Sequence, residues 1–155
     1  MGLFWYQESL GKLPGHTQYF SQLMRMVASN AFVPGYAGIM QRLFIPHAAI
    51  FALFAYCLES FIALSLLLGL LTRLGGTVGA IWSALLFGGM AYARGPGGGP
   101  GGPGPWYFGF MVLMCALLAL TAAGRSLGVD RWLRPVMLRR AAAGDRVARW
   151  VARAE

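Results

Sequence analysis

Charge is what this chain has least of. Only 12% of its 155 residues are charged, and just five residues are acidic. A soluble domain carries about 25% charged residues, and roughly 45–50% apolar ones, whereas 57% of this chain is hydrophobic. Intrinsic disorder is excluded because disordered chains have low hydrophobicity. The composition therefore predicts a small integral membrane protein.

The signatures of resident metals and of nucleophilic catalysis are also missing. Cys57 and Cys115 stand alone, so neither a disulfide scaffold nor a Cys-x-x-Cys site is expected. His16 and His47 are explained better by chance than as a pair of haem ligands. No Gly-x-Ser-x-Gly elbow occurs. We expect no metal and no covalently bound cofactor, and whether the chain is an enzyme stays open.

What the chain does have is three long apolar runs, each nearly free of charge. They cover about residues 48–71, 74–93 and 106–123. The one side chain in these runs that is normally charged is Glu59. A bilayer core about 30 Å thick needs roughly 20 apolar residues in a helix. Helices are expected because backbone groups in lipid must be satisfied within the segment. The sequence therefore predicts an all-α fold with three full spans.

The segments around these runs have different characters. Residues 1–13 are too short to span, and are either an interfacial helix or the outer part of a first helix. Residues 14–46 contain apolar residues at helical spacing, which predicts an outer amphipathic segment. Residues 95–105 consist of glycine and proline, which predicts an outer loop.

The basic residues indicate the orientation. Arg73, Arg125 and the seven arginines from Arg131 to Arg153 lie on one side of the expected spans. Four basic residues lie on the other side: Lys12, Arg25, Arg42 and Arg94. The positive-inside rule places the tail in the cytoplasm. The basic tail, residues 135–155, predicts an amphipathic cytoplasmic helix that binds anionic lipid, and nucleic acid is not expected as a partner.

Glu59 is the most informative residue because it lies near the middle of the first run. An unpaired acid there costs about 2.5 kcal/mol or more, so we expect it to face the bundle interior. Small residues on its face would let a neighbouring helix approach closely: Ala52, Ala55 and Ala63. Candidate hydrogen-bond donors are Gln7, Ser9, Ser60, Trp82 and Ser83. Glu59 is either a proton or ligand contact or an interhelical hydrogen bond.

Three strings of the sequence resemble the DoxX/DoxD family of small bacterial and archaeal membrane proteins. CLESFIALSLLLGLLTRLGG, residues 57–76, resembles the family's acid, glycine and Leu-Thr-Arg turn. GRSLGVDRWL, residues 124–133, is similar to its signature after the last helix. Gly2, Trp5 and Lys12-Leu13-Pro14 resemble the outer end of its first helix. The resemblance covers roughly residues 1–134, and the outer segment is more similar to the DoxD branch.

The resemblance implies a four-helix transmembrane bundle in the inner membrane of a prokaryote, with both ends in the cytoplasm. Family members begin before the position of Gly2, so the first helix is expected to be shortened. Either the start of the chain is misassigned, or the helix is short in the protein itself and packs against partners. DoxD is implied to be a subunit of thiosulfate:quinone oxidoreductase. No residue of this chain indicates thiosulfate itself.

Two hypotheses of function follow. In the first, the chain is a membrane subunit of a quinone-linked oxidoreductase or electron-transfer assembly, and Glu59 contacts a quinone or a proton in transit. Arg73 and Asp130 would then form an ion pair at the cytoplasmic face. In the second, the chain is a non-catalytic accessory subunit of a larger membrane complex. Its helix-packing face would consist of small residues: Ala52, Ala55, Ala63 and Gly69. A small-molecule or ion carrier is a weaker third hypothesis.

Overall fold

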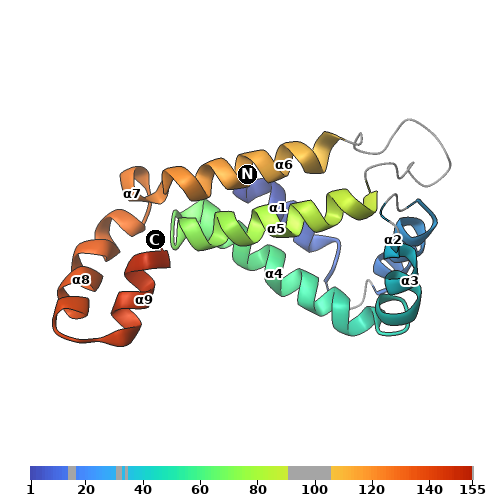
Figure 1. The fold of residues 1–155 in the computed structure, drawn as a ribbon, viewed down its shortest axis with the longest axis horizontal. Coiled ribbons are helices and arrows are strands. Elements are labelled where there is room, and N and C mark those ends of the chain that lie inside the picture. Colours follow the sequence, from blue (N-terminus) through green and yellow to red (C-terminus); the bar gives the residue numbers. More distant parts are fainter. Residues whose placement is uncertain (14–16, 31–32, 34, 91–105, 155) are drawn as a thin grey trace.

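The computed structural model describes residues 1–13, 17–30, 33, 35–90 and 106–154. Within these ranges every regular element is a helix (Figure 1). The helices are α1 (Gly2–Leu10), α2 (Thr17–Asn30), α3 (Tyr36–Ile39), the π-helix η1 (Met40–Phe44), α4 (Ala48–Leu68), α5 (Thr72–Met90), α6 (Trp106–Thr121), α7 (Gly124–Leu127), α8 (Asp130–Ala142) and α9 (Arg146–Ala154). The expected all-α fold is therefore confirmed for this part of the chain.

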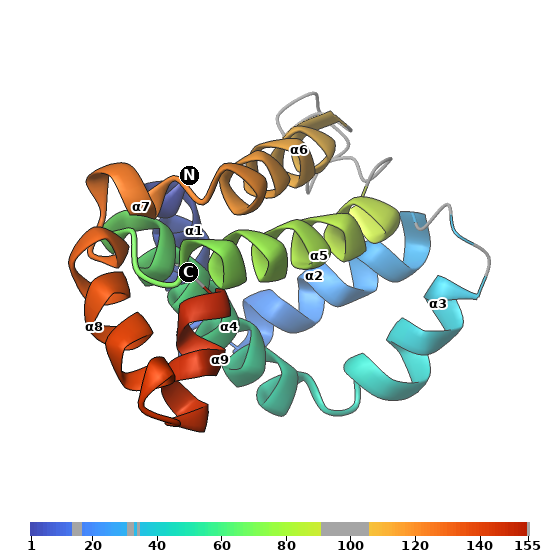
Figure 2. The ribbon, with the colours of Figure 1, turned by 60° about the vertical axis from the view of Figure 1, so that its left-hand side comes forward.

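Helices α4, α5 and α6 run along the length of the molecule, and α5 and α6 lie side by side (Figures 1 and 2). Helix α1 packs against the second half of α4, where Gly2 meets Leu67. Helices α2 and α3 lie at one end, and α7, α8 and α9 at the other (Figure 1). The first half of α4 therefore packs against α2, and the second half against α1.

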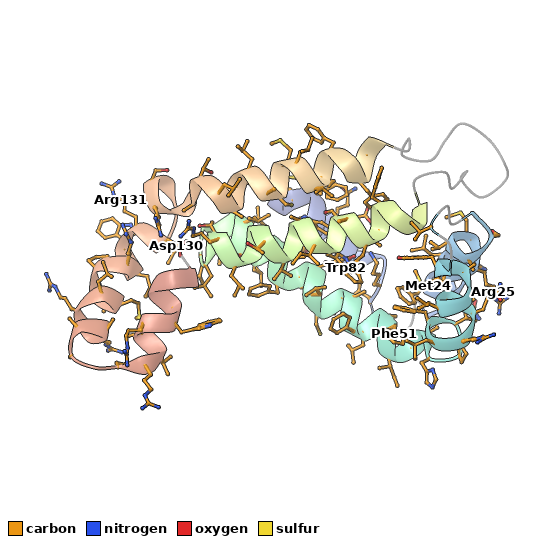
Figure 3. All side chains as sticks on the ribbon, in the orientation of Figure 1. Met24, Arg25, Phe51, Trp82, Asp130 and Arg131 are labelled. Atoms are coloured by element: carbon orange, nitrogen blue, oxygen red, sulfur yellow. The ribbon has the colours of Figure 1, made fainter. Side chains whose placement is uncertain are left out.

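Two hydrophobic clusters correspond to these two halves. Phe20, Met24 and Val27 of α2 meet Ala52 and Ala55 of α4 in the first cluster. Figure 3 shows Met24 directed toward the bundle and its neighbour Arg25 directed away, as the helical period requires. The second cluster joins α1, α4 and α6 through Trp5, Ile62, Ala63, Met111 and Cys115. Small alanines on α4 let both neighbours approach its backbone closely.

By length and composition, α4 is the one helix among the described residues that could cross a membrane. Residues 107–121 form a shorter apolar helix. The outward face of α6 carries large apolar side chains at helical spacing: Phe110, Leu113, Leu117 and Leu120. Because these positions recur at helical spacing, they form one apolar stripe along the exposed side of α6.

The junction of α4 and α5 depends on Asp130, which is fully buried. Its carboxylate accepts hydrogen bonds from the Leu71 N–H at 2.7 Å, the Thr72 N–H at 3.0 Å and the Thr72 hydroxyl at 2.7 Å. These groups form the N-terminus of α5, where unpaired N–H groups and the helix dipole favour an anion. Asp130 therefore caps α5 from a distant helix.

Two details differ from these expectations. Helix α5 begins at Thr72, two residues before the second expected run, because Gly69 ends α4 with φ +63° and the Asp130 cap begins α5 at Thr72. The expected ion pair between Arg73 and Asp130 does not form, since the described ion pairs all involve Lys12. Arg73 is exposed instead. The backbone donors of α5 occupy the carboxylate that Arg73 was expected to bind.

Glycines permit the close contact at this junction. A Cβ on Gly128 would lie 2.5 Å from the Gly69 Cα, and a Cβ on Gly124 would lie 2.6 Å from the Gly69 carbonyl oxygen. The Val129 N–H donates to the Leu68 carbonyl, and the Asp130 N–H to the Gly69 carbonyl, both at 3.0 Å. The segment after α6 is thus hydrogen-bonded directly to the end of α4.

Replacing Asp130 with alanine is expected to destabilise the fold by about 2–3 kcal/mol, because buried donors of α5 lose a charged acceptor. Asp145 is the matched control, since it caps α9 through the Val147 and Ala148 N–H groups but is exposed. Asp145→Ala should cost about 0.5–1 kcal/mol. Denaturant unfolding followed by circular dichroism measures both. Equal losses would contradict the role assigned to Asp130.

Gly128→Ala should destabilise the chain by about 1–3 kcal/mol, because the new methyl group meets backbone rather than a flexible side chain. Gly38→Ala is the control, since a Cβ there meets nothing within 4 Å. That change should be neutral or stabilising by up to about 1 kcal/mol, given the higher helix propensity of alanine. The same unfolding experiment compares the two variants, and a neutral Gly128→Ala would show that the junction can open freely.

Candidate functional site

Glu59 lies in the middle of α4 with none of its surface exposed. The Lys12 ammonium donates to its Oε2 at 2.7 Å, and the Trp82 indole N–H donates to its Oε1 at 3.0 Å. Lys12 follows α1, and Trp82 belongs to α5. Each carboxylate oxygen therefore has a donor from a different neighbouring segment, so Glu59 joins α1, α4 and α5 at one point.

Lys12 is only 6% exposed, which is unusual for a lysine. Helix α1 ends at Leu10, and the Lys12 N–H donates to the Ser9 carbonyl at 3.0 Å, so its side chain leaves the first turn after the helix. The ammonium also donates to the Glu8 carbonyl at 3.1 Å and lies 3.8 Å from the Glu8 carboxylate. Pairing with Glu59 makes its burial tolerable, because an unpaired buried charge is costly.

A cavity of about 220 Å³ adjoins this cluster. Lys12 and Trp82 are part of its wall, and the rest is almost entirely apolar and comes from α2, α3, η1 and α5. The lining residues include Phe20, Leu23, Met24, Val27, Tyr36, Met40, Phe44 and Leu86. Figure 3 shows Trp82 in the middle of the bundle and Met24 on the α2 side. The cavity therefore places one cationic group against an apolar space.

Tyr36 is the other polar group of the wall, and it is already engaged. Its hydroxyl donates to the Leu85 carbonyl at 2.9 Å, which ties α3 to α5. Burial raises the pKa of this phenol above its ordinary value, so it remains a donor at neutral pH. The Lys12 ammonium has three N–H donors, and Glu59 and the Glu8 carbonyl account for two. The third N–H has no hydrogen-bond partner among these two groups, and Lys12 lines the cavity.

Of the expected donors to Glu59, only Trp82 donates to it. Ser9 donates to the Tyr6 carbonyl at 2.7 Å and Ser83 to the Gly79 carbonyl at 2.7 Å, while Gln7 is exposed. The sequence placed Lys12 on the outer side of the expected spans and did not predict that it is buried and pairs with Glu59. Two features of the sequence could have found it: Lys12 is the only lysine, and an acid inside an apolar run needs a cation.

The remaining residues singled out from the sequence lie as follows. Ala52 and Ala55 are buried against α2, and Ala63 is buried in the second cluster. Gly69 is buried at the junction with residues 124–130, and so it contacts a connecting segment rather than the face of a spanning helix. Asp130 and Arg73, which follows the capped Thr72, lie at this same end of the molecule, beside the end of α4, whereas Glu59 lies in the middle of that helix.

Metal ligation finds no support in the described part of the chain, where no group of three or more His, Cys, Asp or Glu side chains comes together. His47 is exposed, and its Nδ1 lies 3.0 Å from the Leu43 carbonyl oxygen. His16 lies outside the described residues. Cys57 is exposed and Cys115 is buried, and both are free thiols.

Comparison of the chain with protein-family models, with curated proteins and with solved structures finds no match. The site offers an apolar space large enough for one ring, since an engineered protein cavity of about 150 Å³ binds benzene. It also offers one charged donor, held in place by Glu59 and, through Glu59, by Trp82.

Lys12→Met and Glu59→Gln are each expected to destabilise the fold by about 3–5 kcal/mol, because each leaves a buried partner uncompensated. The double variant should lose much less than the sum of the two losses, since it removes both polar partners. Glu8→Gln is the control, and should cost under about 1 kcal/mol because the Glu8 side chain is 41% exposed and lies 3.8 Å from the Lys12 ammonium. Denaturant unfolding of the unaltered chain, the two single variants and the double variant completes the cycle, and the control is measured beside them. Additive losses would show that the pair is not coupled.

Proposed function

We propose that the chain is a multi-pass membrane subunit of a quinone-linked oxidoreductase or electron-transfer assembly. The observation that carries this proposal is the cavity beside Lys12, in which an apolar space meets one charged donor. A quinone head is a small apolar ring with carbonyl acceptors, and an apolar tail makes it a membrane molecule. When bound, it would supply an acceptor of electrons. The resemblance to DoxD supports the same substrate class.

The residues present fit a quinone head in size and chemistry. A volume of about 220 Å³ accommodates a single substituted ring. The third N–H of Lys12 can donate to one carbonyl oxygen of that ring. Glu59 and Trp82 would act on Lys12 and not on the ring, because their own hydrogen-bonding groups are engaged with each other and with Lys12. Lys12 is then the binding residue, and Glu59 is a positioning residue.

A membrane location is part of the proposal. Support comes from the length and apolar composition of α4, from the shorter apolar helix of residues 107–121, and from the outward apolar face of α6. Helices α4, α5 and α6 occupy the three apolar runs and would be the spans. Helix α1 covers only the second half of α4, which would make it the shortened first helix of a DoxX-type bundle.

The second candidate function is an accessory subunit without a ligand of its own. One observation favours it: both oxygens of Glu59 are satisfied within the chain, so the acid needs no external partner. In that case the cluster would only join α1, α4 and α5. The two candidates differ in whether the cavity binds a quinone.

Binding of a short-chain ubiquinone to the purified chain in mild detergent, followed by equilibrium dialysis, distinguishes the two candidates. Val27→Phe adds volume to the cavity wall and should weaken binding at least tenfold. Leu113→Phe is the matched control on the exposed face of α6 and should leave binding unchanged. The double variant Lys12→Met with Glu59→Gln should also weaken binding at least tenfold, because the carbonyl loses its donor.

Absence of saturable binding by the unaltered chain would reject the quinone proposal and favour the accessory subunit. Unchanged binding in both Val27→Phe and Leu113→Phe would indicate that the quinone partitions into detergent rather than into the cavity. Circular dichroism of each variant shows whether a loss of binding reflects a loss of fold.

A further inference from the structure

Helices α8 and α9 form a hairpin at one end of the molecule, which we call the tail hairpin (residues 130–154). The two helices lie side by side and run across the direction of α5 and α6 (Figures 1 and 2). Gly144, with φ +96°, makes the turn between them. Helix α9 returns to contact α5. The hairpin is therefore a separate layer across the end of the bundle and not a continuation of it.

The position of this layer is fixed by the contacts of its first residues. The Val129 and Asp130 N–H groups donate to the last carbonyls of α4, and the Asp130 carboxylate caps α5. If α4 crosses the membrane, as proposed above, its last turn lies near one face of the bilayer. The tail hairpin then begins at that face, and its helices run along the membrane plane.

Several large apolar side chains of the hairpin are exposed and are not covered by the bundle. Trp132 is 77% exposed, Val147 is 71% exposed and Trp150 is 58% exposed. On α8, Val136 lies one turn after Trp132 and is exposed as well. Tryptophan is enriched where a membrane meets water, because its large ring is apolar and its N–H needs a polar partner.

Exposed arginines lie on the same two helices as these apolar side chains. Those whose side chains the structure describes on the hairpin are Arg131, Arg134, Arg139, Arg140, Arg146 and Arg149, and all are exposed. The hairpin's described acids are engaged elsewhere: Asp130 is buried in its cap, and Asp145 accepts from the first turn of α9. Figure 3 shows Arg131 directed away from the bundle, opposite to Asp130. The exposed surface of the hairpin is therefore strongly cationic as well as partly apolar.

We infer that the tail hairpin binds the anionic lipid surface of the membrane that α4 crosses. Arginines would contact lipid phosphates, and Trp132 and Trp150 would enter the headgroup layer. An amphipathic helix with a basic polar face and aromatic apolar residues binds a membrane in this way. Charge complementarity selects anionic over zwitterionic lipid, with roughly a fivefold gain in affinity for each basic residue at the surface. The inference rests on the membrane location proposed above.

Hydrogen exchange of the full chain in nanodiscs tests the inference. Amides of residues 131–151 should exchange at least tenfold more slowly in phosphatidylcholine mixed with phosphatidylglycerol than in phosphatidylcholine alone. The difference should disappear at 1 M salt, where the Debye length is about 3 Å. The variant Arg139→Glu, Arg140→Glu, Arg149→Glu should lose it at low salt.

The control variant is Arg25→Glu with Arg42→Glu, which changes exposed arginines at the opposite end of the molecule. It should keep the lipid dependence of the hairpin. Equal exchange in both lipids would overturn the inference, as would protection that salt does not affect. An oligonucleotide that protects the hairpin equally well in phosphatidylcholine nanodiscs would show a general affinity for polyanions and would also overturn it.

The same samples separate this inference from the proposal on which it rests. If the chain fails to co-elute with nanodiscs of either composition, the membrane location is wrong, and the inference falls with it. If it co-elutes with both and the hairpin exchanges equally in both, only the lipid inference is wrong. Quinone binding is measured independently of both outcomes.

Discussion

A carboxylate in the middle of an apolar helix needs a cation or strong donors, and the ion pair of Lys12 with Glu59 meets this need. The pair ties the turn that follows α1 to the middle of α4, because Lys12 reaches Glu59 from just beyond Leu10. It also fixes the rotation of α5, since the Trp82 indole must point at the second carboxylate oxygen. Three segments are thus held in register by one polar cluster.

The same cluster explains why the cavity lies where it does. Helix α1 covers α4 only as far as Glu59, and beyond that level α2 covers it instead. The change from one helix to the other leaves a space beside Lys12 that is walled by α2, α3, η1 and α5. A cavity lined by apolar groups alone would only attract apolar molecules. The lysine at its wall adds a requirement for an acceptor, and this narrows the ligand class.

The sequence predicted the helical runs well, because apolar length and the positions of charges depend on local sequence alone. Residues 48–68, 72–90 and 106–121 are helical, close to the expected runs. It also identified Glu59 and one of its two partners, Trp82. Lys12 was counted only as a charge on the outer side of the spans, and its pairing with Glu59 was not predicted. The positive-inside count treats every basic residue as a surface charge, and a lysine that neutralises a buried acid breaks that assumption.

The second departure, the expected ion pair of Arg73 with Asp130, has a different physical origin. Opposite charges at the same end of a bundle suggest pairing, but a helix N-terminus competes for the same carboxylate with several donors in fixed positions. Asp130 is fully buried, and an arginine would have to be buried with it to pair, at a large desolvation cost. The backbone N–H groups of α5 are uncharged and already lie at the junction, so pairing with them does not require the burial of a second charge. The cap therefore prevails over the ion pair, and it leaves Arg73 exposed on the same end of the molecule as the tail hairpin. Arg73 would therefore add a further cation to the proposed lipid-binding surface, which would extend from the tail hairpin onto the first turn of α5.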